Sequence, residues 1–205
     1  MNYKKIIDVA KGEAAADLLL CNAKVFHVFT KEIVCADVVI ADGIIAGVGQ
    51  YADKPAKETI DLNGAYLVPG FINAHCHVES SMVVPEIYCR EELRHGVTTL
   101  VTDPHEIANV AGLDGILYML KASEHVPVNY FVQMPSCVPA TRFEHAGAVL
   151  SAKELSALKE HPRVLGLGEM MDFPGVLASD EMIIEKLEAF SDRIIDGHAP
   201  GLTGL

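Results

Sequence analysis

Two histidines separated by one residue follow the apolar stretch at the start of LVPGFINAHCHVESSM, which runs from Leu67 to Met82. On a β-strand the side chains of residues i and i+2 point to the same face, so His75 and His77 would project together. Imidazole nitrogens are common ligands of divalent metal ions. A bare H-x-H pattern arises often by chance, so further donors are needed before it indicates a metal site.

Two further donors stand at the ends of later apolar segments. Glu169 ends the segment RVLGLGE, and His198 ends the segment RIIDGH. In parallel α/β proteins, and in barrels above all, the carboxyl ends of the strands form the rim of the active site. Nitrogen and oxygen donors that meet on such a rim suit a divalent metal. We therefore predict that His75, His77, Glu169 and His198 are metal ligands.

A second group of polar residues accompanies this predicted site. The segment TDPHEIANV places Asp103, His105 and Glu106 after another apolar run, and Glu79 lies two residues beyond His77. These side chains could contact the substrate or an auxiliary metal on the same rim. Asp103 and the proline after it could equally begin the turn into the next helix. The residues themselves leave both interpretations open.

The chain beyond Val68 alternates apolar strands with amphipathic helices. Strands separated by helices of 10–15 residues indicate βαβ units around a parallel sheet, so the fold class is α/β. We expect five strand–helix units, with strands at 70–77, 97–105, 127–134, 163–169 and 193–198 and helices near 85–95, 111–124, 151–161 and 179–190.

The first third of the chain has a different pattern. Short β-rich runs lie between Asp17 and Val68, after a helical leader expected at about 4–16. Asp42 and Gly43 separate two of these runs, and an Asp-Gly pair supplies the positive φ angles of a tight hairpin turn. We expect a small antiparallel sheet unit, and hence two domains, 1–68 and 69–205.

Composition restricts the partners and the compartment. The 205 residues include 28 acidic and 16 basic side chains, for a net charge of -12. Such a surface repels phosphate groups, which excludes nucleic acid and anionic membranes as expected partners and favours a small neutral substrate. The five cysteines are an odd number without C-x-x-C spacing, which is typical of reduced cytoplasmic thiols. No signal peptide or transmembrane segment is expected.

Four motifs together resemble the adenine deaminases of the amidohydrolase superfamily. They are PGFINAHCHVESSM, TDPHEIANVAG, GLGEMMDFPGV and DGHAPGLTG, and they occur in the same order. The resemblance implies a (β/α)8 barrel of the TIM type, of which this chain holds about five units, and a small β-sandwich to which the first 68 residues contribute. It implies two divalent ions, manganese or iron and sometimes zinc. His75 and His77 would be the first-strand ligands, Glu169 the bridging carboxylate and His198 the fifth-strand ligand.

The resemblance also implies a reaction. Water activated on the metal would attack C6 of adenine, an acid would protonate the leaving amine, and hypoxanthine and ammonia would form, as in purine salvage. From their position on the same rim, we expect Glu79 or the acids of the DPHE segment to contact the purine base or relay protons. The family supplies a further histidine from strand six and an aspartate from strand eight as general base, both expected beyond Leu205. The chain thus resembles the N-terminal portion of a larger enzyme. A homo-oligomer is compatible with this resemblance.

Two alternatives remain at this point. A cyclic amide hydrolase of the same superfamily, similar to dihydroorotase or imidazolonase, would use the same H-x-H pattern and strand-five histidine. A non-catalytic fragment with an open sheet edge would bind metal weakly or associate with another chain. The glutamate bridge and the DPHE and EMMDFPGV segments favour adenine.

Overall fold

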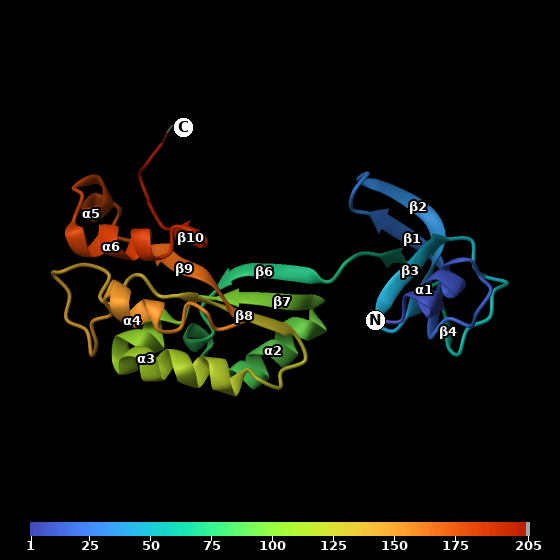
Figure 1. Ribbon diagram of the computed structural model, residues 1–205, viewed down its shortest axis with the longest axis horizontal. Coiled ribbons are helices and arrows are strands. Elements are labelled where there is room, and N and C mark those ends of the chain that lie inside the picture. Colours follow the sequence, from blue (N-terminus) through green and yellow to red (C-terminus); the bar gives the residue numbers. More distant parts are fainter. Residues whose placement is uncertain (204–205) are drawn as a thin grey trace. The chain divides into compact units, whose positions relative to one another are not determined.

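The computed structural model describes residues 1–203. The chain divides into two compact units, Met1–Pro69 and Gly70–Leu205, each with its own hydrophobic core (Figure 1). Within the described residues, no helix is both long and apolar enough to cross a membrane.

The N-terminal unit is one helix with a five-stranded sheet. Its elements are α1 (Tyr3–Ala10), β1 (Leu18–His27), β2 (Glu32–Ala41), β3 (Ile44–Gly49), β4 (Thr59–Asp61) and β5 (Tyr66–Leu67). Strand β2 lies antiparallel between β3 and β1, whereas β4 and β5 both pair with β1 in parallel. The sheet is therefore mixed, and the expectation of an antiparallel unit was wrong for β4 and β5. The chain crosses over after β3 before it returns to β1, and such a crossover produces parallel pairing.

Local sequence signals explain the turn between β2 and β3 and the end of α1. The hairpin prediction is confirmed, because Ala41 pairs with Ile44 across Asp42 and Gly43, whose φ angles are 51° and 73°. The leader helix ends at Ala10 instead of residue 16. Gly12 follows at φ 72°, a left-handed conformation that ends a helix at little cost for glycine.

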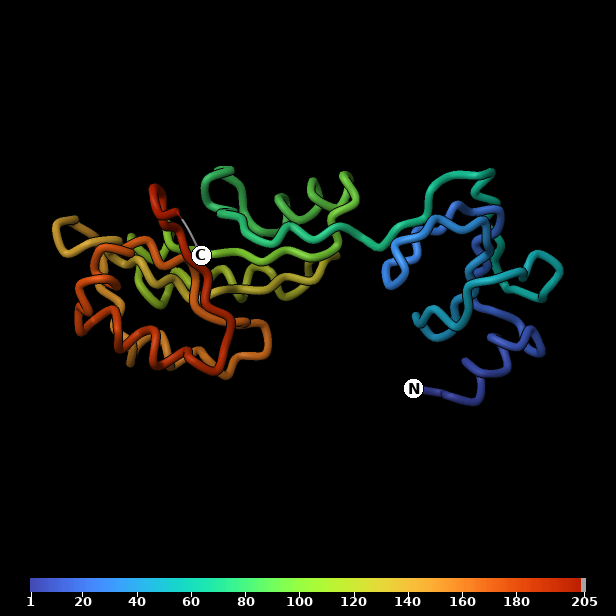
Figure 2. The backbone as a smooth tube through the Cα atoms, turned by 90° about the horizontal axis from the view of Figure 1, so that it is seen from above, coloured from blue at the N-terminus to red at the C-terminus, as the bar shows by residue number. Residues whose placement is uncertain are grey.

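The C-terminal unit is a parallel α/β sheet, as predicted. Its strands are β6 (Phe71–Cys76), β7 (Val97–Thr102), β8 (Asn129–Met134), β9 (Val164–Met170) and β10 (Ile194–Gly197), and they are neighbours in chain order. Its helices are the 3-10 turn η1 (Glu79–Ser81), α2 (Pro85–Arg94), α3 (His105–Ala122), α4 (Ala152–Ser156), α5 (Phe173–Leu177) and α6 (Glu181–Ala189). Figure 2 shows the chain returning from each strand to the next through these helical segments.

Two helices differ from their predicted ranges, and a third was not predicted. Helix α3 begins at His105, six residues before the expected start, and continues through a kink at Gly112, where φ is 60°. Helix α4 has only 5 residues, and α5 was not predicted. Pro104 explains the early start of α3, because a proline just before a helix needs no hydrogen-bonded N–H. The first residues of α3 therefore lie directly at the carboxyl end of β7.

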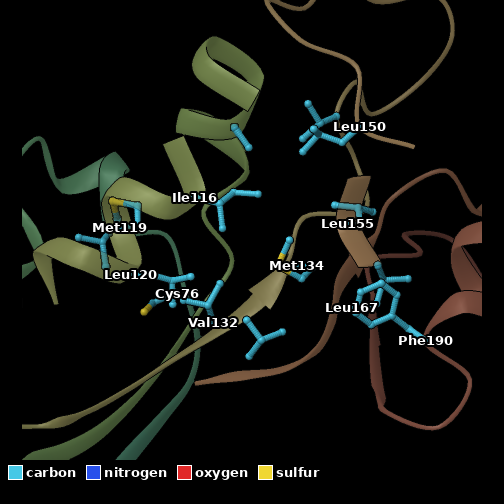
Figure 3. Close-up of a cluster of buried hydrophobic side chains, with 14 of the residues drawn as sticks. Cys76, Ile116, Met119, Leu120, Val132, Met134, Leu150, Leu155, Leu167 and Phe190 are labelled. Carbon is cyan, nitrogen blue, oxygen red and sulfur yellow. The ribbon is translucent and has the colours of Figure 1, made fainter. Parts of the chain in front are cut away.

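The core beneath the sheet fixes the central strands. Helix α3 contributes Ile116, Met119 and Leu120 to a buried cluster that also contains Val132 of β8 and Leu167 of β9 (Figure 3). Strands β8 and β9 are buried along most of their length, whereas β6 and β10 form the exposed edges of the sheet. Burying an aliphatic side chain contributes about 1.5–3 kcal/mol, so β9 is a firmly held support for the glutamate at its carboxyl end.

Candidate metal centre

The carboxyl ends of β6, β9 and β10 bring the four predicted ligands together around Glu169. This side chain is 10% exposed, and each of its oxygens faces imidazoles. Oε2 lies 3.2 Å from His198 Nδ1 and 3.8 Å from His75 Nε2. Oε1 lies 3.4 Å from His77 Nε2. Backbone pairing supports the approach of β10, since the N–H of His198 donates to the carbonyl of Met170.

A fourth imidazole completes this arrangement. His105, the first residue of α3, places Nδ1 3.5 Å from Glu169 Oε1. Each oxygen of Glu169 therefore faces two histidines. Burial lowers the pKa of His105, which favours the neutral imidazole that can bind a metal. The sequence placed His105 on this rim but gave no reason to place it against Glu169.

The other ring nitrogens of the H-x-H pair are already engaged. His77 Nδ1 donates to the carbonyl oxygen of Asp103 at 2.9 Å, and His75 Nδ1 lies 2.9 Å from the carboxylate of Asp196. A carbonyl or carboxylate partner places the proton on Nδ1, so the lone pair of each ring lies on Nε2. This is the usual second-shell arrangement of metal-binding histidines.

The two Nε2 atoms lie 3.1 Å apart. Two lone pairs at this distance repel each other unless a proton or a cation lies between them. Two imidazole nitrogens on one ion, each about 2.1 Å from it, are separated by roughly 3.0–3.4 Å. The chemistry and the spacing of these donors therefore fit a divalent metal.

Asp196 was missed by sequence reasoning. It lies on β10, two residues before His198, which directly follows the strand. The same i, i+2 rule that selected His75 and His77 could therefore have selected Asp196. Cys137 was also missed, and its thiol lies 3.1 Å from His105 Nδ1. No local pattern marks Cys137, because it reaches the site through the loop after β8. Cys76 points away from the site, toward the carbonyl of Val101.

The acids of the auxiliary group share an unusual feature. Glu79 Oε1 accepts from the N–H of Ile107, and Glu106 Oε1 accepts from Ser80 Oγ. Their other oxygens, both Oε2, are buried and have no hydrogen-bond partner. Asp103 is likewise half-paired, with its Oδ1 buried and unpartnered. Burial raises the pKa of Asp103 and, less strongly, of Glu79. Buried acceptors of this kind are rare and mark places where an ion, a proton or a ligand is expected.

Among the described residues, no lysine or arginine offsets this negative charge. Within residues 1–203, neither lysine nor arginine forms an ion pair with any acid of the cluster. Three overlapping groups of donor atoms lie within 4.8 Å of one another: His75, His77 and Glu169; His77, His105 and Glu106; and Asp103, His105 and Glu169. The side chains at the carboxyl ends of the strands thus form a cluster of nitrogen and oxygen ligand atoms that suits divalent cations.

Comparisons with known proteins identify the family of this chain. The sequence profile described as "Amidohydrolase family" matches residues 66–205. "Adenine deaminase 2" of Carboxydothermus hydrogenoformans is 54% identical over 201 residues, which are 98% of this chain and 35% of that protein. "Adenine deaminase" of Dehalococcoides mccartyi is 51% identical over 203 residues, 99% of this chain and 35% of that protein. The chain thus spans about a third of the length of these curated relatives.

Solved structures match in fold. A D-hydantoinase from Bacillus sp. AR9 superposes with a TM-score of 0.62 at 19% identity, over 89% of this chain and 40% of that one. A triazine hydrolase variant gives a TM-score of 0.60 at 17% identity, over 89% of this chain and 53% of that one. At these identities the likeness concerns the fold alone.

Proposed function

The chain belongs to the amidohydrolase family, and on this basis we propose that it is the metal-binding N-terminal part of an adenine deaminase. The observation that carries the proposal is Glu169, whose two oxygens each face two imidazoles on the rim of a parallel sheet. Curated relatives that are about half identical over nearly the whole chain bear the name adenine deaminase, which supports the substrate.

We assign His75, His77, Glu169 and His198 as ligands of two divalent ions, manganese or iron, with zinc as a further candidate. The support is geometric. One carboxylate with imidazoles at both oxygens suits a bridge between two cations. When bound, such ions lower the pKa of water enough to supply a nucleophile at neutral pH.

The reaction replaces the exocyclic amine at C6 of adenine with an oxygen from water. The C6–N bond breaks, a C6–O bond forms, and ammonia leaves with the protons that the site provides. We propose that Glu79, His105 and Glu106 contact the purine base or carry these protons. Glu79 and Glu106 each hold an unpartnered oxygen, and His105 lies against both Glu106 and Glu169. We assign no residue of this chain as the general base.

The proposed partner is therefore a neutral purine base. We propose neither a nucleic acid nor a membrane as a partner. We also propose a cytoplasmic location, supported by the five cysteines, all of which are free thiols.

A chimera tests the proposal. This chain would replace the matching third of the Carboxydothermus hydrogenoformans relative, and the purified protein would be loaded with Mn²⁺. We expect release of ammonia from adenine and no ring opening of cyclic amides such as dihydroorotate. Glu169→Gln should abolish turnover and metal content together, whereas Glu185→Gln, on the exposed face of α6, should change neither.

Two results would count against the proposal. A folded chimera that binds manganese but leaves adenine unchanged would remove the substrate assignment. Turnover of a cyclic amide in its place would favour the alternative hydrolase.

A further inference from the structure

The main chain of Glu169 is held by side chains instead of by neighbouring strands. The last Cα pairing of β9 with β8 is at Leu167, two residues earlier. The N–H of Glu169 donates to Asp103 Oδ2 at 2.9 Å, and its carbonyl accepts from Ser136 Oγ at 2.6 Å. Side chains from the residue after β7 and from the loop after β8 thus replace the sheet hydrogen bonds at this residue.

Asp103 connects Glu169 to the histidines. Its side chain holds the Glu169 N–H, its carbonyl accepts from His77 Nδ1, and its own N–H donates to the carbonyl of Cys76. The contact with β9 is close. A Cβ on Gly168 would lie 2.3 Å from Asp103 Oδ2, so only glycine leaves room for this carboxylate. Asp103 is completely buried.

Ser136 is itself anchored from the opposite side. Its carbonyl accepts from Lys186 Nζ at 2.8 Å, and both residues are at least 95% buried. Lys186 reaches it from α6 and forms no ion pair within the described part of the chain. Burying an ammonium group without a carboxylate partner costs free energy. The hydrogen bond from Lys186 Nζ to the carbonyl of Ser136 offsets part of that cost and holds Ser136 in place.

We propose that Asp103 and Ser136 are positioning residues that fix the main chain of Glu169, with Lys186 holding Ser136 in place. The inference rests on the proposed metal site and assigns Asp103 a role other than ligand or substrate contact. A main chain held at both its N–H and its carbonyl directs the Glu169 side chain toward the four imidazoles. Without one of these bonds the carboxylate samples other positions, and second-shell losses of this kind weaken metal binding by about 10–100-fold.

Equilibrium dialysis of the 205-residue chain against Mn²⁺, with metal counted by mass spectrometry, measures the effect without an activity assay. Ser136→Ala should weaken binding by about 10–100-fold. Ser136→Thr keeps the hydroxyl and should restore the affinity, because Ser136 borders a cavity of about 560 Å³ that can receive the added methyl group.

A matched control separates positioning from stability. Ser123 is equally buried, and its hydroxyl also donates to a main-chain carbonyl, that of Met119 in α3. Ser123→Ala should lower the melting temperature and leave manganese affinity unchanged. Circular dichroism verifies that each variant is folded.

Asp103 allows a second, independent comparison. Asp103→Asn keeps an oxygen that can accept the Glu169 N–H, whereas Asp103→Ala removes it. Positioning predicts that the asparagine variant binds manganese nearly as well as the unaltered chain and that the alanine variant loses about 10–100-fold. A ligand role predicts that both variants lose affinity alike, and that result would overturn the assignment of Asp103.

The remaining outcomes are distinguishable. If Glu169→Gln abolishes manganese binding but Ser136→Ala does not weaken it, the positioning role of Ser136 is wrong and the metal site stands. If the unaltered chain binds no manganese, the metal site itself is wrong and the positioning role falls with it.

Discussion

Buried carboxylates are treated in opposite ways in the two units of this protein. In the N-terminal unit both oxygens of Asp37 accept main-chain N–H groups, from Asn22 at 3.0 Å and from Tyr51 at 2.7 Å. In the C-terminal unit, Glu79, Asp103 and Glu106 each keep one buried oxygen without a partner. The same chemical group is fully paired in one unit and half-paired in the other.

The contrast separates structural from functional polar groups. All buried side-chain atoms without a partner in the described chain, from Glu79 to Gln133, belong to the C-terminal unit. Leaving a buried polar atom unpaired costs about 1–3 kcal/mol. Such a cost persists where binding a ligand offsets it, and we therefore expect the C-terminal unit to be the one whose stability responds to metal.

The largest expected effect is stabilisation of this unit by manganese. At free Mn²⁺ 100 times the dissociation constant, binding should add about 2.7 kcal/mol to the free energy of unfolding. Hydrogen exchange followed by mass spectrometry should show that Mn²⁺ increases the protection of residues 70–203 and leaves the protection of residues 1–69 unchanged. Glu169→Gln should remove the response, and equal protection of both units would contradict the contrast.

A substitution next to Glu169 should have an intermediate effect. In Gly168→Ala the new Cβ would lie 2.3 Å from Asp103 Oδ2, and overpacking of this kind costs about 1–3 kcal/mol. We expect lower stability and weaker manganese binding together. Gly197→Ala is the control, since a Cβ there meets nothing within 4 Å. Urea unfolding measures the stability of each variant, and dialysis measures its manganese affinity. If Gly168→Ala and Gly197→Ala change these quantities equally, the close contact is disproved.

The smallest expected effect belongs to the N-terminal unit. Asp17 binds Lys5 and Lys57, each at 2.7 Å, and these ammonium groups lower the pKa of its carboxyl. A lowered pKa stabilises the fold above the unfolded value of about 3.9 and loses that contribution as the pH falls through the folded value. Asp17→Asn should therefore lower the free energy of unfolding slightly at pH 7, as expected for exposed ion pairs.

Unfolding in urea at pH 7 and at acid pH checks this sign. The difference between Asp17→Asn and the unaltered chain should shrink as the pH falls below about 4. A difference that grows on acidification would show that the two lysines do not act through the charge of Asp17.

Periodic and local patterns predicted most of the fold. The alternation of apolar runs and amphipathic segments predicted five parallel strands, and the Asp42-Gly43 pair predicted the hairpin, because these signals act over a few residues. Helix ends were less accurate. The start of α3 at His105 depends on Pro104, and the end of α1 depends on the φ angle of Gly12.

The candidate site was predicted in part. The i, i+2 rule and the strand ends selected His75, His77, Glu169 and His198, and the structure brings these four side chains together, while their role as ligands stays a prediction. Asp196 followed the same rule and was overlooked. Ser136 and Lys186 could not have been selected, since nothing in their neighbouring residues relates them to Glu169.

By itself, the sequence determined which residues share a face of each strand and which strands carry donors, because side-chain direction follows from the local backbone. Only the tertiary structure decided the partners of those donors. His75 meets Asp196 across 121 residues of chain, and Glu169 meets Asp103 across 66. Neither pair joins neighbouring strands, because β6 and β10 are the two edges of the sheet and β8 lies between β7 and β9. Such pairs depend on the twist and curvature of the whole sheet, which no local pattern encodes.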